Sequence, residues 1–143
     1  MLAGQIALIV SAVFTGAALI INVAEQPARL GLDDRALLVE WKLSYKRAQA
    51  MQAPLAIVGF LLGLLAWRET GNWQWAVGAA VLIANWPYTL LAILPTNNRI
   101  KVIEPENANA TTRALIEKWG ALHAARTALG IVATATFLWA SMS

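Results

Sequence analysis

The chain contains no cysteine in its 143 residues. This absence excludes disulfides, thiolate metal sites and a CxxC redox pair, and with them the membrane oxidoreductases that work through paired thiols. Charged residues are also scarce, at 13% of the sequence against 59% hydrophobic residues, whereas a soluble domain carries about 25% charged residues. The composition predicts a membrane protein, and the length predicts a single domain over residues 1–143.

Other familiar signals are missing as well. The 11 basic and 8 acidic residues give a net charge of +3, but no basic run with interleaved aromatics occurs, so we predict no nucleic-acid partner. His123 is the only histidine, which leaves too few good ligands for zinc or iron. No glycine-rich phosphate loop or nucleophile elbow is present. We therefore predict no metal site.

Four apolar segments fill most of the chain, at residues 2–24, 48–67, 73–94 and 120–140. Each is about long enough to cross the hydrocarbon of a bilayer, which takes roughly 20 residues of helix. Because lipid offers no hydrogen-bond partners to the backbone, segments of this kind span as helices. The sequence predicts an all-α fold, a four-helix transmembrane bundle in contact with the lipid bilayer.

Helical signals continue beyond two of these segments. Asp33 or Asp34 is placed to cap a helix that carries an apolar stripe into the second segment. Thr111 or Thr112 is placed to open a helix that runs into the fourth segment. We therefore expect the second and fourth helices to project from the membrane into the cytoplasm.

Basic residues are distributed unequally between the two sides of the predicted bundle. The loops 25–47 and 95–119 together carry nine Lys and Arg, whereas the turn 68–72 carries one. The positive-inside rule predicts that both large loops are cytoplasmic and both termini periplasmic, in the plasma (inner) membrane of a bacterium.

Tryptophans and small residues give two further expectations. Trp67, Trp73, Trp75 and Trp139 lie near the predicted outer ends of helices, where aromatic side chains anchor a protein at the interface. The small-xxx-small pairs Ala12/Gly16 and Gly59/Gly63 allow two helices to approach closely. The spacing is compatible with packing inside one chain and with packing between two copies in a homo-oligomer.

Polar residues accumulate at the predicted cytoplasmic ends of all four helices. Pro87 removes a helical hydrogen bond in the third helix, so we expect the helix to bend there and line a cavity. The up-and-down topology brings the polar and aromatic residues of the four ends to one level. They are Asn22, Glu25, Trp41, Tyr45, Asn85, Tyr88, Thr89, Asn97, Asn98, Trp119, His123 and Arg126.

One stripe of the fourth helix stands out in this group. Trp119, His123 and Arg126 follow one another at i, i+4 and i+7, so they share a face that must meet protein or water. An unpaired charge inside a membrane is costly. We predict that Arg126 is buried with Glu25 as its counter-ion, which would make the first and fourth helices neighbours.

This combination resembles the DUF1772 family, which includes the anthrone oxygenases of aromatic polyketide pathways. The likeness covers essentially the whole chain. It is carried by loose motifs: residues 22–27, Trp41 with Tyr45, residues 87–89 and 95–98, and the stripe of Trp119, His123 and Arg126.

The resemblance implies insertion of oxygen from O₂ at an activated methylene, which converts an anthrone to an anthraquinone without metal or flavin. It therefore implies that the protein uses no cofactor. Under this interpretation His123 is the base, Arg126 stabilises the anion, and Tyr45 completes the catalytic candidates, while a small aromatic substrate stacks on Trp119. The substrate-binding candidates are Asn22, Glu25, Trp41, Tyr88, Thr89, Asn97, Asn98 and Trp119.

Two other functions use the same features. A non-catalytic accessory or small-molecule-binding subunit would have a similar polar cavity. A transporter would need a homo-oligomer and polar residues on both sides of the membrane, whereas the outer half here is nearly uncharged.

Overall fold

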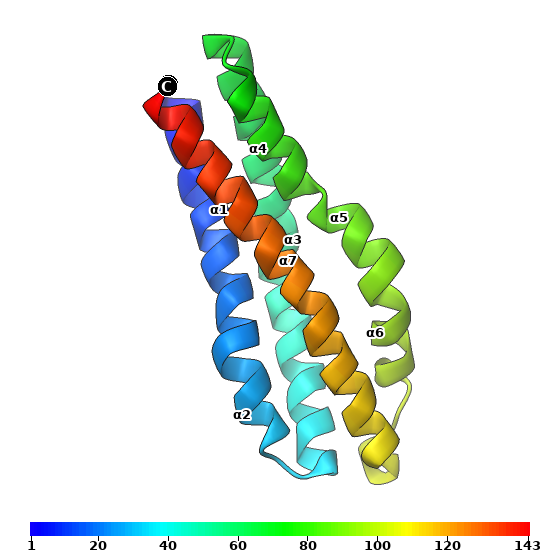
Figure 1. Ribbon diagram of the computed structural model, residues 1–143. Coiled ribbons are helices and arrows are strands. Elements are labelled where there is room, and N and C mark those ends of the chain that lie inside the picture. Colours follow the sequence, from blue (N-terminus) through cyan, green and yellow to red (C-terminus); the bar gives the residue numbers. More distant parts are fainter.

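Four long helical rods form the molecule, and no strand is present. The computed structural model describes residues 1–143 (Figure 1). Each rod contains a stretch long and apolar enough to cross a membrane, within residues 2–30, 34–70, 73–101 and 110–142. The predicted all-α four-helix bundle is confirmed.

Two of the rods are continuous and two are interrupted. The continuous rods are α3 (Asp34–Thr70) and α7 (Ala110–Met142). The first rod consists of α1 (Leu2–Ile20), a π-helical turn η1 (Ile21–Glu25) and α2 (Gln26–Leu30). The third consists of α4 (Trp73–Ile83), α5 (Asn85–Tyr88), a π-helical turn η2 (Thr89–Ile93) and α6 (Leu94–Lys101). A short 3₁₀ turn, η3 (Pro105–Asn107), lies in the last loop.

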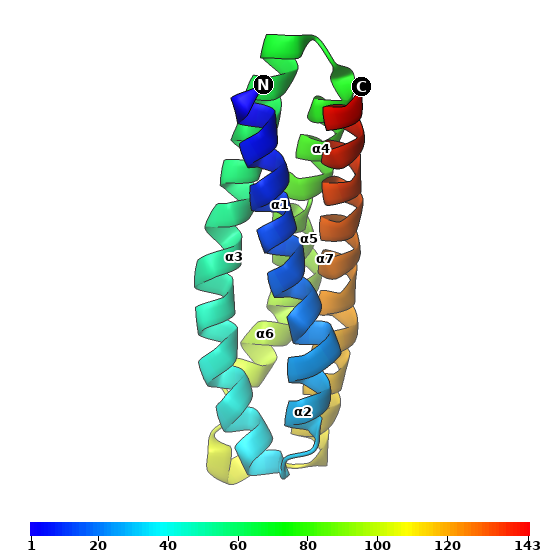
Figure 2. The ribbon, with the colours of Figure 1, turned by 90° about the vertical axis from the view of Figure 1, so that its left-hand side faces the viewer.

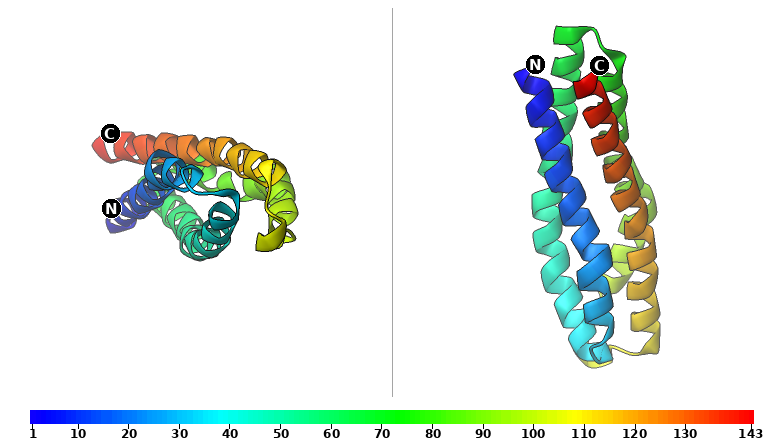
Figure 3. Two further views of the ribbon diagram at one scale, coloured as in Figure 1. Left: turned by 90° about the horizontal axis from the view of Figure 1, so that it is seen from below. Right: turned by 60° about the vertical axis from the view of Figure 1, so that its left-hand side comes forward.

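The rods are arranged as a ring in which each packs against two neighbours. The neighbouring pairs are α1 with α3, α3 with α4, α4 with α7, and α7 with α1. The views along and across the bundle show this up-and-down arrangement (Figures 2 and 3). Both termini lie at one end together with the α3–α4 turn (Figure 2). We call this end the terminal half, and the opposite end, with the two longer loops, the loop half.

Local sequence signals explain where the long helices begin and end. The Asp33 side chain accepts a hydrogen bond from the backbone N–H of Ala36 and caps α3. Gly71, with a φ of 72°, ends the same helix in the left-handed conformation that glycine allows. The helix α7 starts at Ala110, earlier than predicted from Thr111 or Thr112. Asn109 is its cap, in a capping box with Thr112.

The third rod changes direction between α4 and α5 (Figure 1). Pro87 has no N–H to donate to the carbonyl of Ile83, where α4 ends. The Asn85 side chain donates to the carbonyl of Leu82 instead, at 3.0 Å. The expected irregularity near Pro87 is therefore present, and η2 follows it one turn later.

Close packing around aromatic rings fills the terminal half. Trp75 and Phe137 are fully buried and their ring centroids lie 5.7 Å apart. A Cβ atom on Gly63 or Gly78 would approach Phe137 to 2.9 Å or 2.5 Å, so only glycine lets the ring sit there. The prediction that Trp75 is an interfacial anchor is wrong, because its side chain belongs to this core. The other three tryptophans of that group are exposed.

The two small-residue pairs face different surroundings. Gly59 and Gly63 lie against Leu82, Ala79 and Phe137 inside the bundle. Around Gly16, in contrast, no atom would come within 4 Å of an added Cβ. The Gly59/Gly63 pair therefore packs within one chain.

Candidate functional site

Aromatic side chains from α3 and α7 form a cluster in the loop half. Trp41 stacks on Tyr45 with ring centroids 4.8 Å apart, and its ring meets Trp119 edge to face at 5.8 Å. Trp119 in turn stacks on His123 at 5.1 Å. The spacing of four residues along each helix places both pairs on one face. We call Trp41, Tyr45, Trp119 and His123 the aromatic cluster.

Asn22 fixes the orientation of His123. The Asn22 side-chain NH₂ donates to the backbone carbonyl of Gly120 at 2.9 Å, which sets the position of its oxygen. That Oδ1 atom accepts a hydrogen bond from the Thr127 hydroxyl at 2.7 Å and lies 2.7 Å from His123 Nδ1. Because an amide oxygen can only accept, His123 Nδ1 carries the proton and Nε2 is the free acceptor. Nε2 makes no hydrogen bond to the protein.

The π-helical turn η1 supplies this contact. Asn22 is its second residue, and the turn widens the first rod just where it meets α7. Such turns insert one residue into a helix and re-aim the side chains that follow. One turn later the Gln26 side chain donates to the carbonyl of Ile116 at 2.8 Å and lies directly over Gly120. These two amides fasten the first rod to α7 beside His123.

Arg126 lies one turn beyond His123 on α7, at the middle of the bundle. One of its terminal nitrogens donates to Gln52 Oε1 at 3.1 Å, and the guanidinium lies 5.7 Å from the centre of the Phe14 ring. The Nε atom is buried without a hydrogen-bond partner. No carboxylate oxygen lies within 4.0 Å of the side chain. The charge is thus held inside the bundle by neutral groups only.

The prediction that Glu25 pairs with Arg126 is therefore wrong. Glu25 lies 3.7 Å from Arg29, one turn along the same rod, and lines a surface groove on the other side of α3. Arg29 is almost fully buried, pairs with Glu40 at 2.6 Å and lies over the Trp119 ring at 5.5 Å. The carboxylates of Glu25 and Glu40 both lie against Arg29, and neither reaches Arg126. The accompanying expectation that the first and fourth rods are neighbours is correct.

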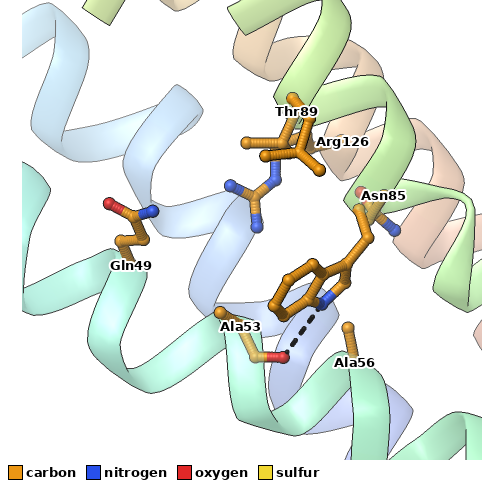
Figure 4. Close-up of a pocket in the computed structure, with 8 residues that line it drawn as sticks. Gln49, Ala53, Ala56, Asn85, Thr89 and Arg126 are labelled. Carbon is orange, nitrogen blue, oxygen red and sulfur yellow. Dashed lines mark hydrogen bonds between the residues drawn. The ribbon is translucent and has the colours of Figure 1, made fainter. Parts of the chain in front are cut away.

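Two small cavities meet at Arg126. The inner cavity reaches the aromatic cluster and has a volume of about 20 Å³, room for one water molecule. It is lined by Ile21, Tyr45, Ala48, Gln49, Gln52, Thr89, Ile93, Asn97, Trp119, His123 and Arg126. The side cavity lies between α3 and the broken part of the third rod and has a volume of about 60 Å³ (Figure 4). It is lined by Gln49, Ala53, Ala56, Asn85, Trp86, Thr89, Leu90 and Arg126.

The predicted site residues divide into three groups by their place relative to the inner cavity. Six of them line it: Tyr45, Thr89, Asn97, Trp119, His123 and Arg126. Three lie behind its wall: Asn22, which contacts His123, Trp41, which stacks on Tyr45, and Tyr88, whose hydroxyl donates to the carbonyl of Leu122. Two lie elsewhere: Glu25 in its separate groove and Asn98 on the surface.

Sequence reasoning missed two glutamines and one tryptophan. Gln49 and Gln52 follow Tyr45 at i+4 and i+7, so the three residues share one face of α3. The same spacing argument that identified the polar stripe of α7 would have identified this one. Gln52 is buried and holds Arg126. Trp86 is one of the residues that line the side cavity, and its indole N–H donates to the carbonyl of Ala53 at 3.2 Å. The dashed line at Ala53 in Figure 4 marks this bond. No local signal distinguishes Trp86 from a lipid-facing anchor.

Comparison with known proteins agrees with the resemblance seen in the sequence. The profile of the anthrone oxygenase family matches residues 41–136, a range that includes most of the inner-cavity wall but not the first rod. The anthrone oxygenase ptaC of Pestalotiopsis fici is 32% identical over 110 residues, and the match covers 67% of this chain and 78% of that protein. No solved structure matches the chain. The chain therefore belongs to the anthrone oxygenase family.

Proposed function

We propose that the protein is a cofactor-independent oxygenase that converts an anthrone-like hydroxyaromatic compound to the corresponding quinone at the inner cavity. The observation that carries this proposal is the pairing of a free acceptor nitrogen, His123 Nε2, with the uncompensated charge of Arg126 on one wall of the cavity. Family membership supports the reaction class.

His123 acts as the general base. Its Nδ1 proton is held by Asn22, so Nε2 presents its lone pair where it can remove one proton from the methylene between two aromatic rings. Trp119 stacks on the imidazole ring and Asn22 holds its edge, so the ring is held in one orientation. A fixed base needs little reorganisation in the transition state.

Arg126 stabilises the anion that this proton transfer creates. The enolate oxygen and, after electron transfer, the reduced oxygen species are both negative, and Arg126 has no carboxylate that would compete for it. A cation held by neutral groups in a site with little water interacts strongly with a developing negative charge. Tyr45, Asn97 and Trp119 line the same cavity and orient the substrate.

The reaction balances without another reductant. The enolate passes one electron to O₂, and the resulting radical and superoxide combine to form a carbon–oxygen bond. Protonated His123 gives its proton to the distal oxygen of this peroxide. Loss of the second methylene proton then breaks the O–O bond, so that one oxygen atom stays as the new carbonyl and the other leaves as water.

The membrane arrangement is part of the proposal. The basic loops face the cytoplasm and the termini face the periplasm of a bacterial plasma membrane, so the loop half with the inner cavity lies on the cytoplasmic side. The nine-to-one distribution of Lys and Arg between the two ends supports this orientation.

A binding subunit is the second candidate, and the size of the inner cavity favours it. With room for one water molecule, the cavity takes a three-ring aromatic compound only after side chains move. Purified protein in lipid vesicles, supplied with anthrone and ¹⁸O₂, separates the two functions. We expect one O₂ consumed per anthraquinone formed and one ¹⁸O atom in the product. Binding without oxygen uptake above that of empty vesicles would establish the binding subunit instead.

A further inference from the structure

The side cavity has features of a binding site of its own. It lies beside the inner cavity and shares Gln49, Thr89 and Arg126 with it. Its outer edge is formed by Trp86 and Leu90, whose side chains are 37% and 52% exposed on the surface of an apolar rod. In a bilayer spanned by this rod, this edge of the cavity would face lipid rather than either loop region.

Two unpaired polar atoms give this cavity a chemical preference. Asn85 is 1% exposed, and its NH₂ group is already used by the carbonyl of Leu82. Its Oδ1 atom is buried without a partner, and so is Nε of Arg126. Buried polar atoms without partners are rare, since each has lost its water contacts without gaining others. Both residues line the side cavity, and because these two atoms have almost no exposed surface, a ligand there reaches the acceptor and the charged donor once the side chains move.

The aromatic edge of the cavity adds a planar surface. The Trp86 indole lines the cavity and is held to α3 by its hydrogen bond to the carbonyl of Ala53. On the α3 side the lining residues at this level are the small residues Ala53 and Ala56, and at about 60 Å³ the cavity takes a multi-ring compound only after side chains move. A swing of Trp86 outward would join the side cavity to the lipid.

We infer that the side cavity is a lateral binding cleft for a planar hydroxyaromatic compound dissolved in the bilayer. An ionised phenolic oxygen binds Arg126, a neutral hydroxyl donates to Asn85 Oδ1, and the rings stack on Trp86. The identity of the ligand rests on the proposed function, because the cleft lies directly against the cavity in which the reaction is placed. The substrate would thus reach His123 from the membrane and pass Arg126 on the way.

The absence of cysteine allows a direct test by labelling. The variant Ala53→Cys places a thiol on the cavity wall, and Leu91→Cys places one on an 80% exposed lipid-facing position of the same rod as Trp86. Both variants are incorporated into vesicles and treated with lipid-soluble N-phenylmaleimide or with a sulfonated maleimide. The probe ligand is 1,8-dihydroxyanthraquinone, which offers no methylene to oxidise.

We expect N-phenylmaleimide to label both variants, and the dihydroxyanthraquinone to slow labelling of Ala53→Cys about tenfold without protecting Leu91→Cys. Adding Asn85→Leu should remove most of the protection, and Trp86→Ala should speed labelling at position 53. Equal labelling with and without the anthraquinone, or faster labelling of Ala53→Cys by the sulfonated reagent, would overturn the lateral cleft. If the anthraquinone protects Ala53→Cys but the protein takes up no oxygen with anthrone, the cleft is supported and the oxygenase is rejected. If the protein takes up oxygen but the anthraquinone gives no protection, the oxygenase is supported and the cleft is rejected.

Discussion

The two halves of the bundle differ in the residues of their cores and in the regularity of their helices. In the terminal half, small residues bring the rods close together around Phe14, Trp75 and Phe137, and the core is apolar. The contacts between α1 and α7 there include hydroxyl pairs, in which Thr134 meets Ser11 at 2.8 Å and Thr15 at 2.9 Å. Every element in this half is regular helix.

The helices of the loop half are less regular. This end, from the middle of the bundle outward, contains both π-helical turns, the break at Pro87, the buried Arg29, the partly buried Arg126 and both cavities. Its core contains the aromatic cluster, and several buried polar atoms have no partner. Irregular helices and unpaired polar groups cost stability, and they gather where a protein binds or reacts. Under the proposed function, the terminal half supplies stability and the loop half contains the reaction site.

Replacing His123 should give the largest effect on turnover. His123→Ala removes the free acceptor nitrogen, so the rate of anthrone oxidation should fall about 10²- to 10⁴-fold, as is usual for loss of a general base. Helix content and melting temperature, measured by circular dichroism, should show a folded protein. The exposed Trp73→Phe variant in the terminal half is the control and should oxidise anthrone at the wild-type rate. Wild-type turnover by His123→Ala would show that another group is the base.

Removing the charge of Arg126 should give the next largest effect. Arg126→Gln should lower kcat about 10²-fold, the size expected when one donor to a developing anion is lost. Arg126→Lys keeps the charge and should retain more activity than Arg126→Gln. If both variants lose activity equally, the reaction depends on the planar geometry of the guanidinium group rather than on its charge.

Loss of Asn22 should have a smaller effect, because it acts through His123. Asn22→Ala frees the His123 ring and should lower kcat about tenfold, the equivalent of one hydrogen bond, with KM unchanged. Asn22→Asp restores an acceptor for Nδ1 and should recover part of the rate. An increase in KM with unchanged kcat would instead place Asn22 in contact with the substrate, as the sequence alone predicted.

A core variant in the terminal half should leave turnover unchanged. Phe137→Ala opens a cavity next to Gly63 and Gly78 and should destabilise the protein by about 3–5 kcal/mol. Thermal unfolding in detergent measures this loss. At a temperature where the variant is still folded, its rate per molecule should equal that of the wild type. A specific loss of rate would mean that the two halves are coupled more tightly than their packing indicates.

Much of the architecture could be predicted from the sequence because it depends on simple regularities. Long apolar segments predict the four rods, and Pro87 predicts the irregular third rod. A cap at Asp33 or Asp34 predicts the start of α3, and the structure selects Asp33. Trp75 was misplaced because an aromatic residue near a helix end has the same local pattern whether it faces lipid or the core. Only the packing of Phe137 against it distinguishes the two.

The site could be predicted as a set of residues but not as a set of contacts. The polar stripe of α7 is visible in the sequence, and six of the predicted residues do line the inner cavity. The partner of Arg126 could not be identified, because a carboxylate is the obvious choice and the competing Arg29 lies on the same rod as Glu25. The role of Asn22 depends on a π-helical turn, which has no clear sequence signal.

The central claim is that His123 removes a proton from the bound substrate, and hydrogen exchange tests it without the oxygen step. Anthrone is incubated anaerobically in D₂O with vesicles containing the wild type, His123→Ala or Trp73→Phe, and loss of the methylene signal is followed by NMR. We predict that the wild type and Trp73→Phe accelerate exchange above the rate in empty vesicles, whereas His123→Ala does not. Exchange by His123→Ala at the wild-type rate, or no acceleration by the wild type, would contradict the account.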